Sequence, residues 1–180
     1  MADITKALAV IFGHEGGFTE DPDDNGNWTG GKPGAGILKG TKFGISAASY
    51  PNEDIKGLTL ERAGQLYGRD FWSPLRLSEI NNQTIATEIF DTAVNCGAGT
   101  AAMIAQKSVN MTNYPDPDIV VDGNIGPATI AAINSHRSPK SYHKALNGFQ
   151  FMHYEKIWEN DPRKEKYMRS WLSRVFEAEV

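Results

Sequence analysis

The 180-residue sequence predicts an α+β fold that is mainly helical and carries one small β-hairpin. Three observations lead to this class. Apolar residues recur at helical spacing near the N-terminus and again after Thr59, whereas alternation of apolar and polar residues is confined to residues 37–46. The length fits one ordinary domain, or one domain with a small appendage, and it allows a substantial core.

The first predicted helix runs from Ile4 to His14, with Ala7, Leu8, Ile11 and Phe12 on one face. Glu15 follows in the last turn, before two glycines on which a helix can end. The carboxyl end of a helix carries partial negative charge, so this position favours the protonated form of Glu15. We therefore regard Glu15 as a candidate general acid. The alternative is a solvated glutamate at a helix end.

An acidic loop follows, and we expect it to supply a second carboxylate. We choose Asp24 for this role, with Asp21 and Asp23 as close alternatives. The competing interpretation is an acidic turn whose side chains only cap the backbone and interact with solvent. The loop also matches the first half of a calcium-binding EF-hand loop, but Lys32 stands at the twelfth position, where a glutamate is required. We therefore predict no metal there.

The segment from Trp28 to Gly40 is rich in glycine and predicts a mobile flap, since the P-loop order of residues is missing. The short hairpin of residues 37–46 comes next, and Thr41 within it is a candidate to contact water or sugar. We also assign Tyr50 to substrate binding.

The rest of the chain predicts helices. Thr59 is a good N-cap, and Gln83 to Val94 forms a buried central helix that ends near Asn95. An alanine-rich helix follows over residues 99–110, and Pro127 occupies the first position of another helix. Residues 140–180 predict two helices divided at Asp161. Their apolar stripe more often closes a core than disturbs a membrane.

Composition and charge narrow the function classes. The chain is 40% hydrophobic and 22% charged, has a net charge of −4, and contains one cysteine, Cys96, which excludes an internal disulfide. The start does not read as a signal peptide, so we expect synthesis in the cytoplasm. The N-terminal part of the chain is acidic and residues 140–174 are basic. The sequence contains no nucleic-acid-binding motif. This charge distribution favours good solubility, and the basic C-terminal part is suited to contact an anionic cell envelope.

Several motifs resemble those of the glycoside hydrolase family 108 muramidases, the phage and bacterial lysozymes with a Glu-Gly-Gly motif. The resemblance covers nearly the whole chain. The matching stretches are His14-Glu15-Gly16-Gly17-Phe18, Asp21-Pro22-Asp23-Asp24, Thr41-Lys42-Phe43-Gly44-Ile45-Ser46, Leu58-Thr59, Tyr67 with Phe71-Trp72, Phe90-Asp91-Thr92-Ala93-Val94-Asn95-Cys96-Gly97, and Val121-Asp122-Gly123-Asn124-Ile125-Gly126-Pro127.

The resemblance implies a lysozyme-like fold in which the β-hairpin lobe forms one wall of a cleft. It implies a catalytic region over residues 1–110 and a peptidoglycan-binding helical region over 111–180, packed into one globule. Its implied activity is hydrolysis of the β-1,4 bond after N-acetylmuramic acid, without a cofactor, with Glu15 as acid and Asp24 and Thr41 as partners. Asp24 follows Glu15 by nine residues, a spacing similar to that in the phage T4-type lysozymes. The substrate-binding set is Asp21, Asp23, Tyr50, Asn95 and Asp122.

We expect a monomeric phage endolysin that acts on peptidoglycan glycan strands after holin-type release and binds no nucleic acid. A non-catalytic wall-binding or virion structural protein and a chitinase-like glycanase remain alternatives. A zinc peptidase would need His-Glu-x-x-His, which the four histidines do not form. A Cys-His peptidase would need a reactive Cys96, and that residue sits in a helix-ending pattern that indicates a buried thiol.

Overall fold

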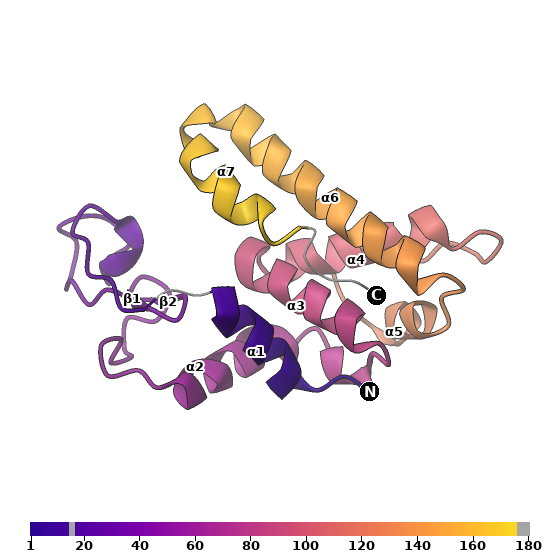
Figure 1. Ribbon diagram of the computed structural model, residues 1–180, viewed down its shortest axis with the longest axis horizontal. Coiled ribbons are helices and arrows are strands. Elements are labelled where there is room, and N and C mark those ends of the chain that lie inside the picture. The colour runs from indigo at the N-terminus through magenta and orange to yellow at the C-terminus, as the bar shows by residue number, and fades with distance from the viewer. Residues whose placement is uncertain (15–16, 176–180) are drawn as a thin grey trace. The chain divides into compact units, whose positions relative to one another are not determined.

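The computed structural model describes residues 1–14 and 17–175. Within this part of the chain, α-helices dominate and the one sheet has two antiparallel strands (Figure 1). The predicted mainly helical α+β class with a small hairpin is therefore confirmed. None of the described helices combines the length and the apolar character that a membrane span requires.

The chain divides into two compact units, Leu8–Gly68 and Met1–Ala7 with Arg69–Val180. Helix α1 (Ile4–His14) contributes to both, because the division falls after Ala7. The second unit is held to the N-terminus by hydrogen bonds from Ala2 N to Ile80 O, 2.7 Å, and from Asp3 N to Gln83 Oε1, 2.7 Å. The border predicted at residue 110 lies between a catalytic and a peptidoglycan-binding region. The division into compact units does not test that border, which stays a prediction.

The unit of residues 8–68 is built from α1, a hairpin and α2 (Leu60–Tyr67). Strands β1 (Thr41–Lys42) and β2 (Ile45–Ser46) pair antiparallel, with Thr41 opposite Ser46. The turn between them places Phe43 and Gly44 at φ values of 51° and 74°, which is the left-handed conformation that two-residue hairpin turns favour. The predicted hairpin is thus confirmed, with Phe43 in its turn.

Aromatic side chains pack the end of α1 within this unit. The ring of Phe12 lies 6.1 Å from the rings of both Phe43 and Tyr67. The hydroxyl of Tyr67 donates to Phe43 O at 2.9 Å. Gly64 approaches Leu8 so closely that an added Cβ would lie 3.0 Å from Leu8 Cδ1. The hairpin turn and the start of α2 are therefore fixed against α1.

The other unit is a helical bundle around α3 (Gln83–Cys96), which carries fully buried Ile85, Ile89 and Phe90. Helix α4 (Ala98–Thr112) lies beside α3, and α6 (Pro139–Asn160) packs on both (Figure 1). The shorter elements of this unit are the π-helix η2 (Gly68–Trp72), the 3₁₀ segments η3 (Leu77–Glu79) and η4 (Pro162–Lys164), and the α-helices α5 (Pro127–Asn134) and α7 (Glu165–Leu172).

The helix caps agree with the sequence. The Thr59 hydroxyl accepts from Arg62 N at 3.2 Å, Pro127 begins α5, and Asp161 caps η4 by accepting from Arg163 N. Leu60, in contrast, is 51% exposed rather than part of the buried face of α2.

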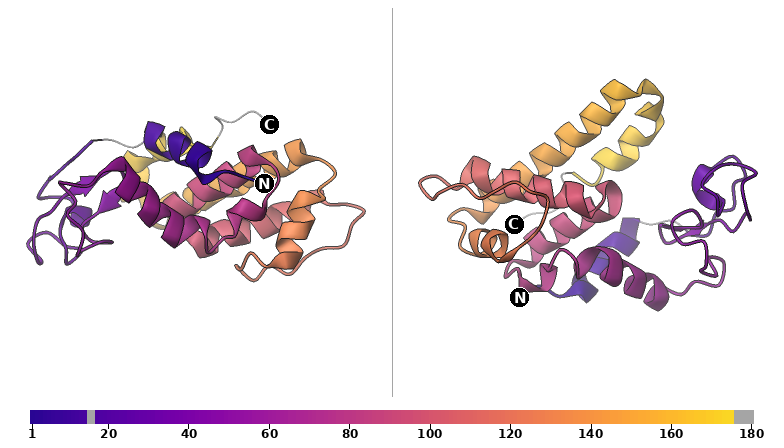
Figure 2. Two further views of the ribbon diagram at one scale, coloured as in Figure 1. Left: turned by 90° about the horizontal axis from the view of Figure 1, so that it is seen from below. Right: turned by 180° about the vertical axis from the view of Figure 1, so that it is seen from behind.

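The apolar stripe of the last helix differs from expectation. Helix α7 folds back along α6 (Figure 2), yet none of its residues is buried, and Tyr167 is 43% exposed. Trp171 stacks on Tyr154 and on Tyr167, with ring centroids 5.2 and 5.8 Å apart. Val175, beyond the helix, is fully buried. The stripe therefore forms an aromatic stack at the surface, because α7 contacts only one side of its neighbours.

Candidate functional site

Glu15, the candidate acid, lies outside the described residues, and so does Gly16 of the Glu-Gly-Gly motif. The contacts of the residues on either side of them are as follows. Before them, Phe12 is packed by Phe43 and Tyr67. After them, Thr19 pairs with Thr41 through two backbone hydrogen bonds of 2.9 Å. The residue four positions after Glu15 is thus fixed beside the predicted Thr41.

The three aspartates of the acidic loop are exposed and differ in their bonding. One carboxylate oxygen of Asp21 accepts from Asp23 N at 2.9 Å, and one of Asp24 accepts from Gly26 N at 2.9 Å. Asp24 is also the N-cap of the short 3₁₀ helix η1 (Asn25–Asn27). The carboxylate of Asp23 has no hydrogen-bond partner among the described residues. Asp24 is therefore held in place by the backbone that it caps, whereas Asp23 is not.

Asn27 organises this loop, although the sequence analysis did not single it out. Its side chain is fully buried, accepts the Thr41 hydroxyl hydrogen bond at 2.7 Å, and donates to Asp21 O at 3.0 Å. Its carbonyl oxygen accepts from Lys39 N and Gly40 N. One amide thus connects the acidic loop, the returning chain and strand β1. The only sequence signal was an asparagine after two aspartates and a glycine, which is typical of any turn.

Asp24 and Thr41 come together around Gly26. A Cβ placed on Gly26 would stand 3.4 Å from Asp24 Oδ1, 3.6 Å from Ser46 Cβ and 3.9 Å from Thr41 Oγ1. A carboxylate and a hydroxyl therefore flank a backbone position that carries only hydrogen. Such a pair can accept hydrogen bonds from a water molecule and orient it, and the carboxylate can act as its general base.

Tyr50 belongs to the same unit and is half-buried. Its backbone N–H donates to Ser46 O at 2.9 Å, so Tyr50 follows directly from strand β2. The unit thus contains all the predicted site residues before position 60. Asn95 and Asp122 lie in the other unit.

The Asp122 carboxylate is already engaged within its own turn. Asp122 Oδ1 accepts from Gln106 Nε2 at 2.8 Å and from Asn124 N at 2.9 Å. These two bonds hold the pKa of Asp122 below its usual range, the one from Gln106 contributing most. Gln106 Oε1 accepts in return from Asp122 N and Gly123 N. The bonding gives Asp122 a structural task, and its predicted contact with substrate stays a prediction.

Asn95 lies in the last turn of α3 and is exposed. Its Nδ2 donates to the carbonyl oxygen of Asp91 at 2.8 Å and to Asp91 Oδ2 at 3.3 Å. Asp91 is buried and also accepts from Arg174 Nη1 at 2.8 Å. The amide oxygen of Asn95 therefore faces outward from a fixed side chain, as a binding or capping residue requires.

A buried polar cluster between α3 and α6 was not predicted. Glu88 and His143 are 7% and 6% exposed, with Glu88 Oε2 3.4 Å from His143 Nε2. Burial raises the pKa of Glu88, and the hydrogen bond from His143 opposes this rise. In the described part of the chain, three buried oxygens lack a partner: Glu88 Oε1, Asn147 Oδ1 and Gln150 Oε1. The signal in the sequence was an acid on the apolar face of α3.

The sequence analysis also considered metal and cysteine chemistry. No group of three or more His, Cys, Asp or Glu side chains among residues 1–14 and 17–175 is arranged to hold a metal ion. Burial raises the pKa of the Cys96 thiol to about 11, so the reactive thiolate is scarce at neutral pH. This agrees with the expectation of an inert cysteine.

Comparisons with known proteins give two family matches along the chain. Residues 8–97 match the family described as glycosyl hydrolase 108, and residues 100–176 match the family described as a predicted peptidoglycan domain. The chain is also similar to the structure of Brucella abortus SagA, with a TM-score of 0.68 and 22% sequence identity, over 96% of this chain and 88% of that chain. At this identity the likeness shows the fold. No curated protein matches the chain.

Proposed function

Because the chain belongs to the glycosyl hydrolase 108 family and acts as a peptidoglycan hydrolase, we propose that it is an N-acetylmuramidase. The bond cleaved is the β-1,4 linkage between N-acetylmuramic acid and N-acetylglucosamine. One observation carries this proposal. The family match over residues 8–97 contains the Glu15-Gly-Gly motif together with the cluster of Asp24, Asn27 and Thr41.

Glu15 is the proposed general acid, which protonates the glycosidic oxygen as the bond breaks. Asp24 accepts a proton from the attacking water or stabilises the positive charge that develops on the sugar. The Thr41 hydroxyl donates to Asn27 Oδ1, so its lone pairs are free to accept a hydrogen bond from the attacking water. The separation of the two carboxyl groups sets the outcome, about 5 Å for retention and about 6.5–9.5 Å for inversion.

Hydrolysis of isolated peptidoglycan by Glu15→Gln and Glu61→Gln variants tests this mechanism. Glu61 is an exposed glutamate on α2, so its variant controls for the loss of one charge. We expect Glu15→Gln to lose roughly 10²–10⁴-fold in rate, the contribution typical of a general acid, and Glu61→Gln to keep full activity. A Glu15→Gln variant with normal activity contradicts the mechanism. Products with N-acetylglucosamine at the new reducing end contradict the bond assignment.

The biological setting that we propose is lysis of a bacterial host by a phage. Expression of the protein inside bacteria tests this role, because a wall hydrolase in the cytoplasm is separated from its substrate by the inner membrane. We expect no lysis from expression alone and rapid lysis once that membrane is made permeable. Rapid lysis without permeabilisation would show that the protein reaches the wall by another route.

A further inference from the structure

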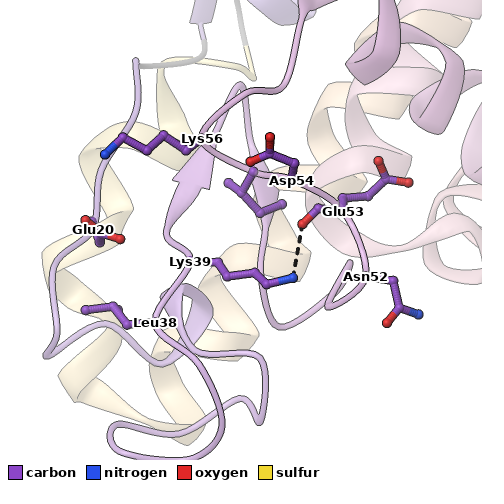
Figure 3. Close-up of a pocket in the computed structure, with 8 residues that line it drawn as sticks. Glu20, Leu38, Lys39, Asn52, Glu53, Asp54 and Lys56 are labelled. Atoms are coloured by element: carbon purple, nitrogen blue, oxygen red, sulfur yellow. Dashed lines mark hydrogen bonds between the residues drawn. The ribbon is translucent and has the colours of Figure 1, made fainter.

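A second surface feature of the unit of residues 8–68 is a pocket with a volume of about 360 Å³ (Figure 3). This is roughly ten times the ~30 Å³ share of one water molecule in the liquid, so the pocket can hold a group of several non-hydrogen atoms. Three stretches of chain contribute to it: Glu20, Leu38 with Lys39, and the loop of residues 52–56.

The pocket combines both signs of charge with apolar walls. Leu38 and the buried Ile55 supply aliphatic surface. Lys56 extends toward the segment that carries Glu20, and Asp54 lies on the same loop (Figure 3). No ion pair joins Glu20, Asp54 or Lys56 to another described residue. The pocket therefore presents the Lys56 ammonium and the carboxylates of Glu20 and Asp54 outside any ion pair, whereas the Lys39 ammonium is bound to backbone carbonyl oxygens.

Other bonds hold the walls in a fixed shape. Lys39 Nζ donates to Pro51 O at 2.6 Å and to Glu53 O at 3.3 Å, which ties the loop to the returning chain. Asp54 Oδ1 accepts from Gly57 N at 3.1 Å. Lys42 Nζ donates to Lys56 O at 3.0 Å. These hydrogen bonds fix the backbone that carries the charged groups, which lowers the entropic cost of binding a ligand.

The pocket also lies next to the proposed catalytic cluster. Lys39 N, on the pocket wall, donates to the carbonyl oxygen of Asn27, whose side chain binds Thr41. Glu20 directly precedes Asp21 of the acidic loop. The pocket and the proposed catalytic cluster are therefore joined through Lys39 with Asn27 and through Glu20 with Asp21.

We infer that the pocket binds the zwitterionic end of an amino acid, with a carboxylate on Lys56, an ammonium on Glu20 and Asp54, and an aliphatic stem on Leu38 and Ile55. This inference rests on the proposed function for the source of the ligand. Peptidoglycan carries such groups on the peptides attached to N-acetylmuramic acid, where a diamino acid ends in an ammonium and a carboxylate on one carbon. The substrate is then a glycan strand with its peptides in place.

Kinetics on two matched substrates test the inference, namely glycan strands with diaminopimelate-containing peptides and the same strands stripped of peptide by an amidase. The variants are Lys56→Met, Glu20→Gln and Asp54→Asn, with Lys32→Met as the control. Lys32 is an exposed lysine of the same unit outside the pocket. We expect each pocket variant to raise KM about tenfold on peptide-bearing strands, as loss of a charge-assisted hydrogen bond would. Their kcat, and both constants on stripped strands, should match wild type.

Equal effects of the pocket variants on both substrates, or no effect on either, overturn the inference while leaving the proposed function intact. A second test, an NMR titration with N-acetylmuramyl tripeptide, does not depend on turnover. We expect shifts of the Leu38 and Ile55 methyl signals in wild type and in Glu15→Gln, and none in Lys56→Met. Absence of shifts in wild type overturns the pocket assignment. Shifts with free diaminopimelate but not with the muramyl tripeptide overturn the peptide assignment and make the pocket a free amino-acid site.

Discussion

Asn27 illustrates how one buried side chain can position the exposed residues of a site. Because the amide is fully buried, each of its hydrogen bonds is protected from water, and an unpaired group there would cost roughly 1–3 kcal/mol. The amide instead binds the Thr41 hydroxyl and the carbonyl oxygen of Asp21. The exposed carboxylate of Asp24 thus stands on a turn whose interior is fixed.

The first prediction concerns which loop aspartate acts in catalysis. Asp24→Asn keeps an oxygen that can accept from Gly26 N, so the turn survives while the charge is lost. We expect kcat on peptidoglycan to fall by about 10²-fold or more, with an unchanged thermal midpoint. Asp23→Asn is the control, since its carboxylate bonds to none of the described residues, and it should keep near-normal kcat. The reverse pattern would move the role from Asp24 to Asp23.

Sequence alone could identify some of these residues and not others. Glu15 and the aspartates were proposed from a carboxylate at a helix end before two glycines, from the acidic turn that follows and from the family resemblance, and their roles stay predictions. Asn27 was missed because its role depends on contacts with Thr41, fourteen residues away. A polar residue in a polar loop gives no sign that folding will bury it.

At the scale of elements, the turn after α4 is fastened by Gln106. This side chain is 1% exposed and bonds to Asp122 and Gly123 on one side and to Thr129 of α5 on another. The order Asp-Gly-x-x-Gly-Pro therefore has a structural reason in this chain. It closes a connection between two helices before Pro127 begins the second.

The second prediction tests the conformation of this turn. Gly123 has φ of 76°, which is unfavourable for alanine, whereas its Cβ would make only ordinary contacts. We expect Gly123→Ala to lower the free energy of unfolding by about 1–2 kcal/mol. Gly99→Ala, within α4 and facing open space, should instead raise it by about 0.5–1 kcal/mol. Urea titrations measure both, and equal destabilisation by the two changes would contradict the strain argument.

The ends of the helices could be predicted from local sequence signals. The burial of each helix against its neighbours could not. The caps at Thr59, Pro127 and Asp161 were predictable because capping depends on residues within one turn. The exposure of α7 was not, since an apolar stripe shows that a helix has a preferred face but not how much of that face a neighbour covers. The stacking of Trp171 on Tyr154 arises only when α7 folds back on α6.

At the scale of the whole molecule, a buried network of ionisable side chains helps to hold the larger unit together. It links α3 with α6 through Glu88 and His143, and α3 with the chain after α7 through Asp91 and Arg174. The Asp91–Arg174 pair is 9% exposed on each side. Buried charges of this kind cost free energy unless they are paired, so the network ties the packing of three segments to their protonation.

The third prediction is a pH dependence of stability. Burial raises the pKa of Glu88, so the folded state binds a proton more tightly than the unfolded state does. The free energy of unfolding contributed by Glu88 is then present below its unfolded pKa of about 4.3 and is lost as pH rises through the folded pKa. We expect Glu88→Gln to gain stability relative to wild type as pH increases. Urea titrations from pH 4 to 8 measure this gap, and the exposed Glu61→Gln should show none.

A stability difference between Glu88→Gln and wild type that stays constant, or that moves in favour of wild type as pH rises, would contradict the assignment. The network itself was beyond sequence reasoning, because Glu88 and Arg174 are far apart in the chain and both residue types are usually exposed. The division into units was likewise not foreseen. It depends on long-range bonds such as Ala2 N to Ile80 O, which no local pattern encodes.

The glycine-rich segment forms a side loop whose two ends are fastened. Trp28 pairs with Leu38, and Thr29 N donates to Ile37 O at 3.0 Å. Residues between them can therefore be added or removed without displacing the chain on either side. Evolution is free to vary the length of this loop among related enzymes while the chemistry beside it stays in register. The same freedom makes residues 31–34 a suitable place to graft a peptide tag or a second binding module.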